Sequence, residues 1–406
     1  MSRARPADRS GPGIPQRGRS RPWMAPLLAA IIVLVAACAG PILADPAATR
    51  PARPTGPTPS APPVDPQPIV FPRDDGAHDR LTEWWYYTGH LVDEAGGRYG
   101  FEFVIFRAER GVFPVTWASH LAITDETGGR FHYAQRSEIG PQVDQTPSVS
   151  SGPTSFLLAI SGLLGGVPPD GRTPWTMQGH EGDDRLSASL TPAEAIAADA
   201  PGGLGLDLHL AATKPPALHD TDGWIDFGPA GGSYYYSRTA LDAAGSMIVD
   251  GRPMSVTGTA WFDHQWGDFI AVGGGGWDWF ALNLGDGTDI TLSLVRAADG
   301  SYPLVYGTLV DRAGRSRRLD RSEFTVTARG TWRSPTTEAT YPAGWTVEIP
   351  GQGLRVELRP TVADQELDTR ATTGVVYWEG SQRVIATRDG RPLGGRAYVE
   401  LTGYGP

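Results

Sequence analysis

The side chains best suited to carry out chemistry lie in one short stretch, Thr257 to Phe269, which reads TGTAWFDHQWGDF. It holds aromatic, acidic and imidazole groups that can bind apolar molecules and move protons. These are Trp261, Asp263, His264, Trp266 and Asp268. Side chains alternate across a β-strand, so a strand here would place Asp263 with Trp261 and Gln265, and His264 with Phe262 and Trp266. The carboxylate and the imidazole would then face opposite sides of a sheet.

Six ionisable residues stand next to a tryptophan or one residue away from it. They are Glu83, Asp263, His264, Asp268, Asp278 and Glu379. Aromatic walls exclude water and raise the pKa of a carboxyl group, which lets it act as an acid near neutral pH. The same composition also arises when a tryptophan-rich strand only satisfies buried hydrogen bonds. Both interpretations stay open from these residues.

Several other chemistries are excluded. The chain has no G-x-S-x-G, H-E-x-x-H or P-loop motif. His264 and Asp268 would share a face only on a helix, so we predict no metal site in this stretch. The formal net charge of −10 makes nucleic acid an unsuitable partner. A single cysteine excludes an internal disulfide framework and a zinc site built on several thiolates.

The elements that must position these residues read as short strands from Phe71 onward. Turn residues recur at short intervals between alternating segments, which predicts an antiparallel all-β barrel or sandwich. One helix is predicted over 190–200, with Thr191 as N-cap, Pro192 in the first turn and Glu194 completing a capping box. The glycine run from Gly273 to Gly276 is predicted to be a loop.

The N-terminal region reads as a leader followed by a spacer. Six arginines precede an apolar run that ends in Val35-Ala36-Ala37-Cys38, a sequence similar to the lipobox of bacterial lipoproteins. We therefore predict a signal peptide over 1–37 and lipidation of Cys38. Residues 38–70 are rich in proline and are expected to form a disordered linker. An ordinary signal peptide with a chance cysteine is the alternative.

An ordered set of motifs runs from Phe71 to the C-terminus: EWWYYTGHL, KPPALHD, SYYYSRTAL, WFDHQWGDF, WDWFALNL, DQEL, YWEG and YVELTGY. As a set, these motifs resemble those of the AttH and carotenoid 1,2-hydratase family. The resemblance implies two lipocalin-like β-barrels in tandem, which we place at 71–255 and 256–406. The family's usual Asp-His-Glu-Trp reads Asp263-His264-Gln265-Trp266 here, so the glutamate is replaced.

The resemblance also implies a reaction. In the hydratases a proton adds to an isolated double bond, and water captures the resulting carbocation without a cofactor. Carried onto this chain, Asp263 or Asp268 is the acid, and His264 positions or deprotonates the water. We expect the three aromatic motifs to meet in one cavity near the interface of the two domains. The expected lining is Glu83, Trp84, Trp85, Tyr86, Tyr234, Tyr235, Tyr236, Trp261, Trp266, Trp277 and Trp279.

Two functions follow from different classes. The first is a membrane-tethered, extracytoplasmic carrier of an isoprenoid or lipid-like ligand, which assists an ABC transport system as the resemblance to AttH implies. The second is a carotenoid 1,2-hydratase-like hydro-lyase; a secreted hydrolase is a lesser alternative. The leader, the linker and the lost glutamate favour the carrier, facing the periplasm or the cell exterior.

Overall fold

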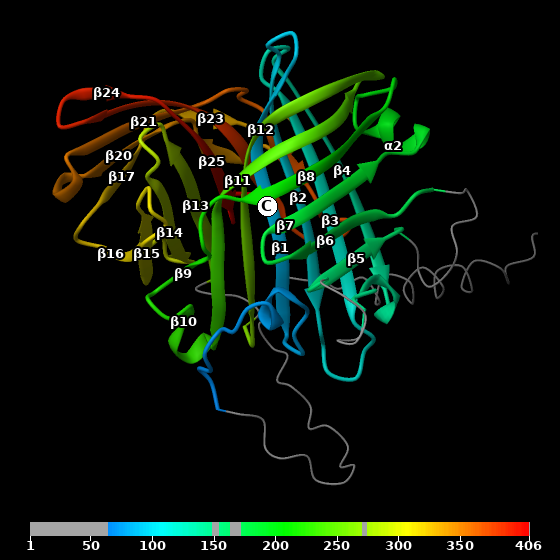
Figure 1. Ribbon diagram of the computed structural model, residues 1–406, viewed down its shortest axis with the longest axis horizontal. Helices are drawn as coiled ribbons and strands as arrows, with labels where there is room; N and C mark the ends of the chain where they lie inside the picture. Colours follow the sequence, from blue (N-terminus) through cyan, green and yellow to red (C-terminus); the bar gives the residue numbers. More distant parts are fainter. Residues whose placement is uncertain (1–63, 148–153, 163–171, 270–273, 406) are drawn as a thin grey trace, which may run out of the picture. The chain divides into compact units, whose positions relative to one another are not determined.

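The computed structural model describes residues 64–147, 154–162, 172–269 and 274–405. Within them the protein is all-β, as predicted, and its strands form two large antiparallel sheets (Figure 1). None of its described helices has the length and apolar character needed to cross a membrane. The predicted signal peptide, Cys38 and the linker up to residue 63 lie outside the described residues.

The first sheet has the strand order β4-β3-β2-β1-β12-β11-β8-β7-β6-β5, with β9 and β10 paired to β11. It curves until β5 contacts β3 and β4, so the described strands nearly close a barrel (Figure 1). Its strands are β1 (Thr82–Asp93), β2 (Arg98–Ala108), β3 (Thr116–Asp125), β4 (Arg130–Ile139), β5 (Phe156–Ile160), β6 (Trp175–His180), β7 (Asp183–Ser189), β8 (Leu204–Ala212), β9 (Ala217–Leu218), β10 (Trp224–Asp226), β11 (Gly232–Val249) and β12 (Arg252–Gly267).

The second sheet has the order β16-β15-β14-β13-β25-β23-β21-β20-β17, with β22 and β24 paired to β23, and forms a half-barrel. Its strands are β13 (Gly274–Leu284), β14 (Asp289–Ala297), β15 (Leu304–Val310), β16 (Ser316–Asp320), β17 (Thr325–Ala328), β20 (Trp345–Ile349), β21 (Leu354–Pro360), β22 (Glu366–Asp368), β23 (Val376–Arg388), β24 (Arg391–Leu393) and β25 (Gly395–Thr402). A separate hairpin joins β18 (Thr331–Arg333) to β19 (Thr340–Pro342).

The predicted helix is present as α2 (Pro192–Ala197), and Thr191 and Glu194 form the predicted capping box. Single 3-10 turns complete the described elements: η1 (Arg73–Asp75), η2 (Pro141–Val143), η3 (Gly228–Ala230) and η4 (Pro350–Gln352). The predicted division of the chain at 255/256 falls inside β12, whereas the sheets change between β12 and β13. That division into domains stays a prediction.

The prediction of a loop over the glycine run is wrong for Gly274 to Gly276, which begin β13 with a β-bulge. Gly276 has a φ of +85°, and a Cβ there would lie 2.3 Å from the carbonyl oxygen of Thr402. These glycines therefore let the strand bend and approach β25 closely. Gly273 lies outside the described residues.

Strands β1 and β12 lie side by side at the centre of the first sheet and carry two buried faces. Trp85 pairs with His264 across the strands, and the next pair is Tyr86 with Asp263. Neighbouring pairs point to opposite sides of a sheet. The first pair faces the core of the first barrel, whereas Tyr86 joins a small aromatic cluster that includes Trp279 of β13. The chemistry of the central stretch is thus divided between two environments.

Residues 64–70, which precede β1, pack on the first sheet. Asp65 binds Arg80 and the hydroxyl of Tyr234, and the backbone N–H of Gln67 donates to the same hydroxyl at 2.6 Å. Ile69 packs against the barrel core. Residues 64–70 therefore belong to the folded part of the chain, and the expectation that the disordered linker extends to residue 70 is wrong for them.

Candidate functional site

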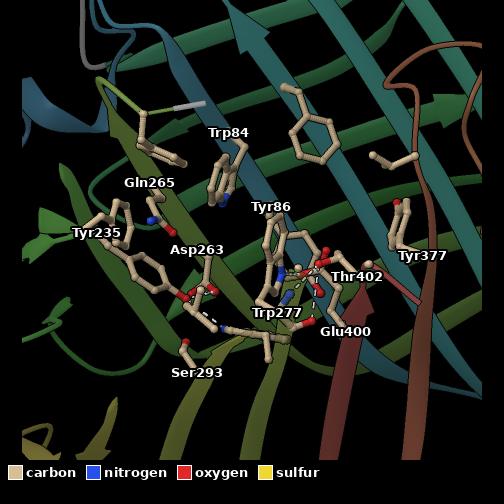
Figure 2. A pocket seen from close by; sticks show the side chains of 18 of the residues that line it. Trp84, Tyr86, Tyr235, Asp263, Gln265, Trp277, Ser293, Tyr377, Glu400 and Thr402 are labelled. Atoms are coloured by element: carbon tan, nitrogen blue, oxygen red, sulfur yellow. Dashed lines mark hydrogen bonds between the residues drawn. The ribbon is translucent and has the colours of Figure 1, made fainter. Parts of the chain in front are cut away.

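A cavity of about 450 Å³ lies between the two sheets. Its described lining comes from β1, β2, β11 and β12 on one side and from β13, β14, β15, β23 and β25 on the other (Figure 2). The walls are mostly aromatic, and the polar side chains are acidic or neutral. The principal members are Trp84, Tyr86, Glu102, Phe106, Tyr235, Asp263, Gln265, Phe269, Trp277, Trp279, Tyr306, Tyr377 and Glu400. None of the described lining residues is Lys, Arg or His.

Asp263 accepts more hydrogen bonds than the other carboxyl groups described in this cavity. Its Oδ2 accepts a hydrogen bond from Tyr235 at 2.5 Å, and its Oδ1 accepts from Trp261 Nε1 at 2.7 Å and from the hydroxyl of Ser237. Figure 2 shows Tyr235 and Asp263 in contact on the cavity wall. Burial raises the pKa of Asp263 to about 6, although the three donors oppose that rise. At neutral pH this group is therefore mostly a carboxylate.

Glu102, on β2, is fully buried and has a sparser environment. Its Oε1 contacts the hydroxyl of Tyr377 at 2.9 Å, and its Oε2 has no hydrogen-bond partner among the described residues. Burial raises the pKa of Glu102 to about 8, with a further contribution from the charge of Glu400. At neutral pH this group is therefore mostly a carboxylic acid that can donate a proton.

Two more carboxyl groups complete the acidic set. Glu400 lines the cavity and accepts from Trp277 Nε1 at 2.9 Å, and burial raises its pKa to about 7. Glu379 lies behind Tyr86, whose hydroxyl donates to it at 2.8 Å. Burial and the nearby Glu400 raise the pKa of Glu379 well above its usual range. Four carboxyl groups, of which Asp263, Glu102 and Glu379 are buried and Glu400 is partly buried, thus share one region without a cation in the described cavity lining.

His264 lies on the other side of β12, in the core of the first barrel. Its Nε2 lies 3.0 Å from Glu83 Oε1, and His78 Nδ1 lies 2.7 Å from the same oxygen. Burial lowers the pKa of His264, whereas the charge of Glu83 raises that of His78 against the effect of burial. Although burial opposes the shift, the imidazoles lower the pKa of Glu83 to about 2. Glu83 is therefore a carboxylate that the two imidazole rings stabilise.

The same three side chains could hold a metal ion, since their ligand atoms lie within 4.8 Å of one another. Imidazole and carboxylate are ordinary ligands for zinc. The backbone N–H of His78 also donates to Glu83 Oε2 at 3.0 Å, and the ring of His78 stacks on Trp266 at 4.0 Å. His264 Nδ1 is buried and has no hydrogen-bond partner among the described residues, so one ring nitrogen of the cluster stays unsatisfied.

The structure divides the predicted site residues between these places. Among them, the residues on the cavity wall are Trp84, Tyr86, Tyr235, Asp263, Trp277 and Trp279. Trp261 lies behind the wall and bonds Asp263. The others pack in or at the edge of the first barrel: Glu83, Trp85, Tyr234, Tyr236, His264 and Trp266. The expectation of one cavity shared by Glu83, Asp263 and His264 is wrong, because β12 places its alternate residues on opposite faces.

Two further acid candidates lie outside the cavity lining. Asp268 binds Arg80 at 2.9 Å and the backbone N–H of Leu81 at 3.2 Å. Asp278 pairs with Arg296 at 3.0 Å and accepts from Tyr404, while burial raises its pKa to about 6. Each of these carboxylates therefore has an arginine partner that ties it to the fold.

Sequence reasoning missed Glu102, Glu400 and Tyr377. Glu102 sits inside YGFEFVIF, an otherwise apolar strand, and Glu400 inside YVELTGY. A single carboxylate in an apolar strand is costly to bury, which is a signal that could have found both glutamates. The stretch KPPALHD also supplies His219, which bonds Ser237 at 2.7 Å and whose ring centroid lies 3.9 Å from that of Tyr235. It braces two of the three donors of Asp263.

Comparisons with known proteins agree on fold and family. The AttH-like family model matches residues 62–404. The crystal structure of an AttH protein from Nitrosomonas europaea has 31% identity and a TM-score of 0.68, covering 85% of this chain and 100% of that one. No curated protein matches the chain in sequence.

Two more solved structures share the fold at low identity. Kievitone hydratase from Nectria haematococca has 17% identity and a TM-score of 0.58, covering 79% of this chain and 88% of its own. CghA has 12% identity and a TM-score of 0.50, covering 80% and 89%. The predicted tandem lipocalin-like architecture is confirmed. From the match over nearly all of the described residues, the chain belongs to the AttH-like family.

Proposed function

We propose that this protein is a cofactor-independent hydro-lyase that adds water to, or removes it from, an apolar molecule bound between the two sheets. The observation that carries this proposal is a pair of carboxyl groups in one cavity with pKa values on either side of neutrality. Glu102 has a pKa raised to about 8 and Asp263 one raised to about 6, both mainly by burial. Such a pair supplies a proton donor and an anion at the same pH.

The cavity walls support an apolar substrate. Pockets for small molecules usually have a volume of about 300–1,000 Å³, and this one has about 450 Å³. Trp84, Tyr86 and Trp277 present aromatic surface to it (Figure 2), and Trp279 also lines it. Aromatic faces attract a cation, so they also stabilise positive charge that develops on a protonated double bond.

The residues have distinct roles in this reaction. Glu102 gives its proton to one carbon of an isolated double bond, whose π electrons form the new C–H bond and leave a cation on the other carbon. A water molecule attacks that carbon and loses a proton to Asp263, directly or through the hydroxyl of Tyr235, which lies 2.5 Å from Oδ2. Charge and atoms balance, with one proton given and one taken. The fold is shared with kievitone hydratase, a hydratase by name.

The test is the incorporation of oxygen from water. The full chain is incubated in H₂¹⁸O with a short acyclic isoprenoid that has an isolated terminal double bond, and the product is analysed by mass spectrometry. We expect an ¹⁸O-labelled alcohol, and a loss of about 10²-fold or more in its rate of formation for Glu102→Gln and Asp263→Asn. Glu126→Gln is the matched control, because Glu126 is a buried glutamate outside the cavity that bonds Ser381. It should keep the rate.

The second candidate is a carrier of an apolar ligand, which the aromatic walls favour equally. Quenching of tryptophan fluorescence by the same isoprenoid measures binding without turnover. Binding without any ¹⁸O product, across a panel of such alkenes, would support the carrier and contradict the hydro-lyase. Equal binding by wild type and Glu102→Gln, with product from wild type alone, supports the enzyme.

We also propose that the protein is extracytoplasmic and held at a membrane by lipidated Cys38, where it meets apolar ligands and, as a carrier, components of an ABC transporter. The basic and apolar leader before Cys38 supports this placement. A diacylglyceryl mass on a peptide that begins at Cys38 is the expected result. An unmodified Cys38 would contradict it.

A further inference from the structure

A line of hydrogen bonds leads from Glu102 in the cavity wall across both sheets. Tyr377 on β23 contacts Glu102 Oε1 at 2.9 Å, and the same hydroxyl lies 2.7 Å from His120 Nδ1 on β3. His120 Nε2 lies 3.1 Å from Thr372 Oγ1, in the turn between β22 and β23. Thr372 Oγ1 in turn lies 2.7 Å from Gln135 Oε1 on β4. Every link is within ordinary hydrogen-bond distance.

The line runs from a dry interior to partly exposed side chains. Glu102 and His120 are 0% exposed and Tyr377 is 3% exposed. Thr372 and Gln135, at the far end, are partly exposed to solvent. The line therefore joins a carboxyl group with no exposed surface to a hydroxyl group on a partly exposed residue.

The donor and acceptor roles along the line are coupled, so all of its hydrogen bonds point the same way. Burial lowers the pKa of His120 to about 3, so its ring is neutral and carries one proton. A neutral imidazole donates through one nitrogen and accepts through the other. If Nε2 donates to Thr372, then Nδ1 accepts from Tyr377, and Tyr377 must accept from a protonated Glu102. If Nδ1 donates, every link reverses, and Tyr377 donates to Glu102.

In the outward arrangement each hydroxyl or N–H donates towards Gln135, and the hydrogen bonds of Gln135 are compatible with it. Gln135 Nε2 donates to the backbone carbonyl of Asp368 at 2.8 Å, which fixes its Oε1 as an acceptor. Thr372 therefore has a ready acceptor when its hydroxyl proton points away from His120. In that state Glu102 is a carboxylic acid whose proton lies on Oε1. This outward arrangement agrees with the raised pKa of Glu102, whereas in the reverse arrangement the Tyr377 hydroxyl donates to Glu102 Oε1.

We propose that Tyr377, His120 and Thr372 form a proton relay that exchanges the proton of Glu102 with solvent. The proposal rests on the proposed function, because it explains how the acid is recharged after each proton transfer. It adds two positioning residues, His120 and Thr372, that do not line the cavity.

One recharging step balances as follows. After Glu102 has given up its proton, the two hydroxyls and the ring of His120 turn to the reverse arrangement, in which Nδ1 carries the imidazole proton. Glu102, now a carboxylate, takes the phenolic proton of Tyr377, and Tyr377 takes the Nδ1 proton of His120. His120 Nε2 then takes the hydroxyl proton of Thr372, which takes a proton from water. One proton enters at Thr372, one arrives on Glu102, and each carrier ends with the number of protons with which it began. No redox partner or cofactor is required.

The same line could instead serve only to hold the two sheets together, because it joins β2, β3 and β4 to β23. That structural role predicts a change in stability but no change in the rate at which the Glu102 proton exchanges. Exchange therefore separates the two interpretations, and it needs no substrate.

The experiment follows the infrared C=O band of protonated Glu102 in the full chain after transfer into D₂O at neutral pH. The band is identified by its loss in Glu102→Gln. We expect Tyr377→Phe and Thr372→Val to keep the band but to slow its shift on deuteration by about tenfold or more. Thr372 is partly exposed, so Thr372→Val keeps the test valid if Tyr377→Phe fails to fold.

Tyr87→Phe is the matched control, since it removes the same hydroxyl from a buried carboxyl group outside the cavity lining, Asp184. It should leave the exchange rate of the Glu102 band unchanged. An unchanged rate in both Tyr377→Phe and Thr372→Val would overturn the relay alone. Absence of any band that Glu102→Gln removes would overturn the relay and the assigned acid together. Intact relay behaviour with no ¹⁸O product would overturn only the hydro-lyase.

Discussion

Asp263 and His264 are neighbours in the chain, yet they lie in regions with opposite electrostatics. On the barrel side of β12, Glu83 is 0% exposed and its pKa falls to about 2. On the cavity side, Glu102 is equally buried and its pKa rises to about 8. Burial alone therefore does not decide the charge of a carboxyl group in this protein.

The difference is the supply of positive charge. Glu83 has His78 at 2.7 Å and Arg107 at 3.9 Å, and both imidazoles of its cluster contact one carboxylate oxygen. The described lining of the cavity offers Glu102 only the neutral hydroxyl of Tyr377. A carboxyl group without a cation in an apolar site keeps its proton. An acid with a raised pKa in a cavity is a candidate functional group, whereas Glu83 and its cationic neighbours form a structural cluster.

The largest expected effect tests this contrast with one substitution on each side. We expect Glu83→Gln to lower the free energy of unfolding by about 3–5 kcal/mol, because it removes the anion from a buried pair. Glu102→Gln replaces a neutral acid by a neutral amide of the same shape and should change stability by less than about 1.5 kcal/mol at neutral pH. Urea unfolding followed by tryptophan fluorescence measures both. A loss of stability in Glu102→Gln as large as that in Glu83→Gln would contradict the proposed difference between the two faces of β12.

The second prediction concerns the pH dependence of stability. The folded-state pKa of Glu102, about 8, lies above the ordinary 4.5 of an unfolded glutamate. The folded state therefore binds the proton more tightly, so this stabilising term is complete below the unfolded pKa and is lost as pH rises towards 8. We expect the melting temperature to fall over this range, and less steeply in Glu102→Gln.

Glu83→Gln serves as the control, because the pKa of Glu83 is shifted in the opposite direction to that of Glu102. The pKa of Glu83 is lowered to about 2, so its contribution is complete above the ordinary pKa and is lost only in acid. Its substitution should leave the slope between about pH 5 and pH 8 unchanged apart from the titration of the released His78. Equal slopes for wild type and Glu102→Gln would show that Glu102 ionises freely in the fold.

Much of this architecture could be predicted from the sequence, because alternation and turn residues are local signals. The opposite faces of Asp263 and His264, the capping box at Thr191 and the all-β class are confirmed by the structure. The partners of those residues could not be predicted. Glu102 and Tyr377 are 275 positions apart and meet only because β2 and β23 face each other. Alternation predicts that two neighbouring residues point to opposite faces of the sheet, but it does not predict which strand each of them contacts.

The motifs also misled where their residues were treated as one set. EWWYYTGHL, SYYYSRTAL and WFDHQWGDF do lie on adjacent strands, as the pairing of β1, β12 and β11 shows. Their similar composition concealed that every strand contributes to both faces. Glu83, Tyr236 and His264 supply the barrel core, whereas Tyr86, Tyr235 and Asp263 reach the cavity or its wall. Which residues face the cavity depends on the second sheet, and the position of that sheet is set by contacts between residues far apart in the sequence.

The smallest expected effect sharpens the comparison at Gln265, where the family's usual residue is a glutamate. Gln265 lines the cavity between Trp84 and Tyr235 on the neighbouring strands and donates to Ser233 Oγ at 2.7 Å. In Gln265→Glu, a protonated carboxyl group can make the same hydrogen bond, so little stability is lost in mild acid. Once ionised, it adds a negative charge where the described lining has no cation. We therefore expect a loss of about 1–2 kcal/mol near pH 8 and almost none near pH 5, measured by urea unfolding. Ser233→Ala removes the hydrogen bond without adding charge, and its loss should be the same at both pH values. A pH-independent loss in Gln265→Glu would mean that the cavity tolerates an added carboxylate, and the contrast between the two faces of β12 would then not rest on the supply of cations.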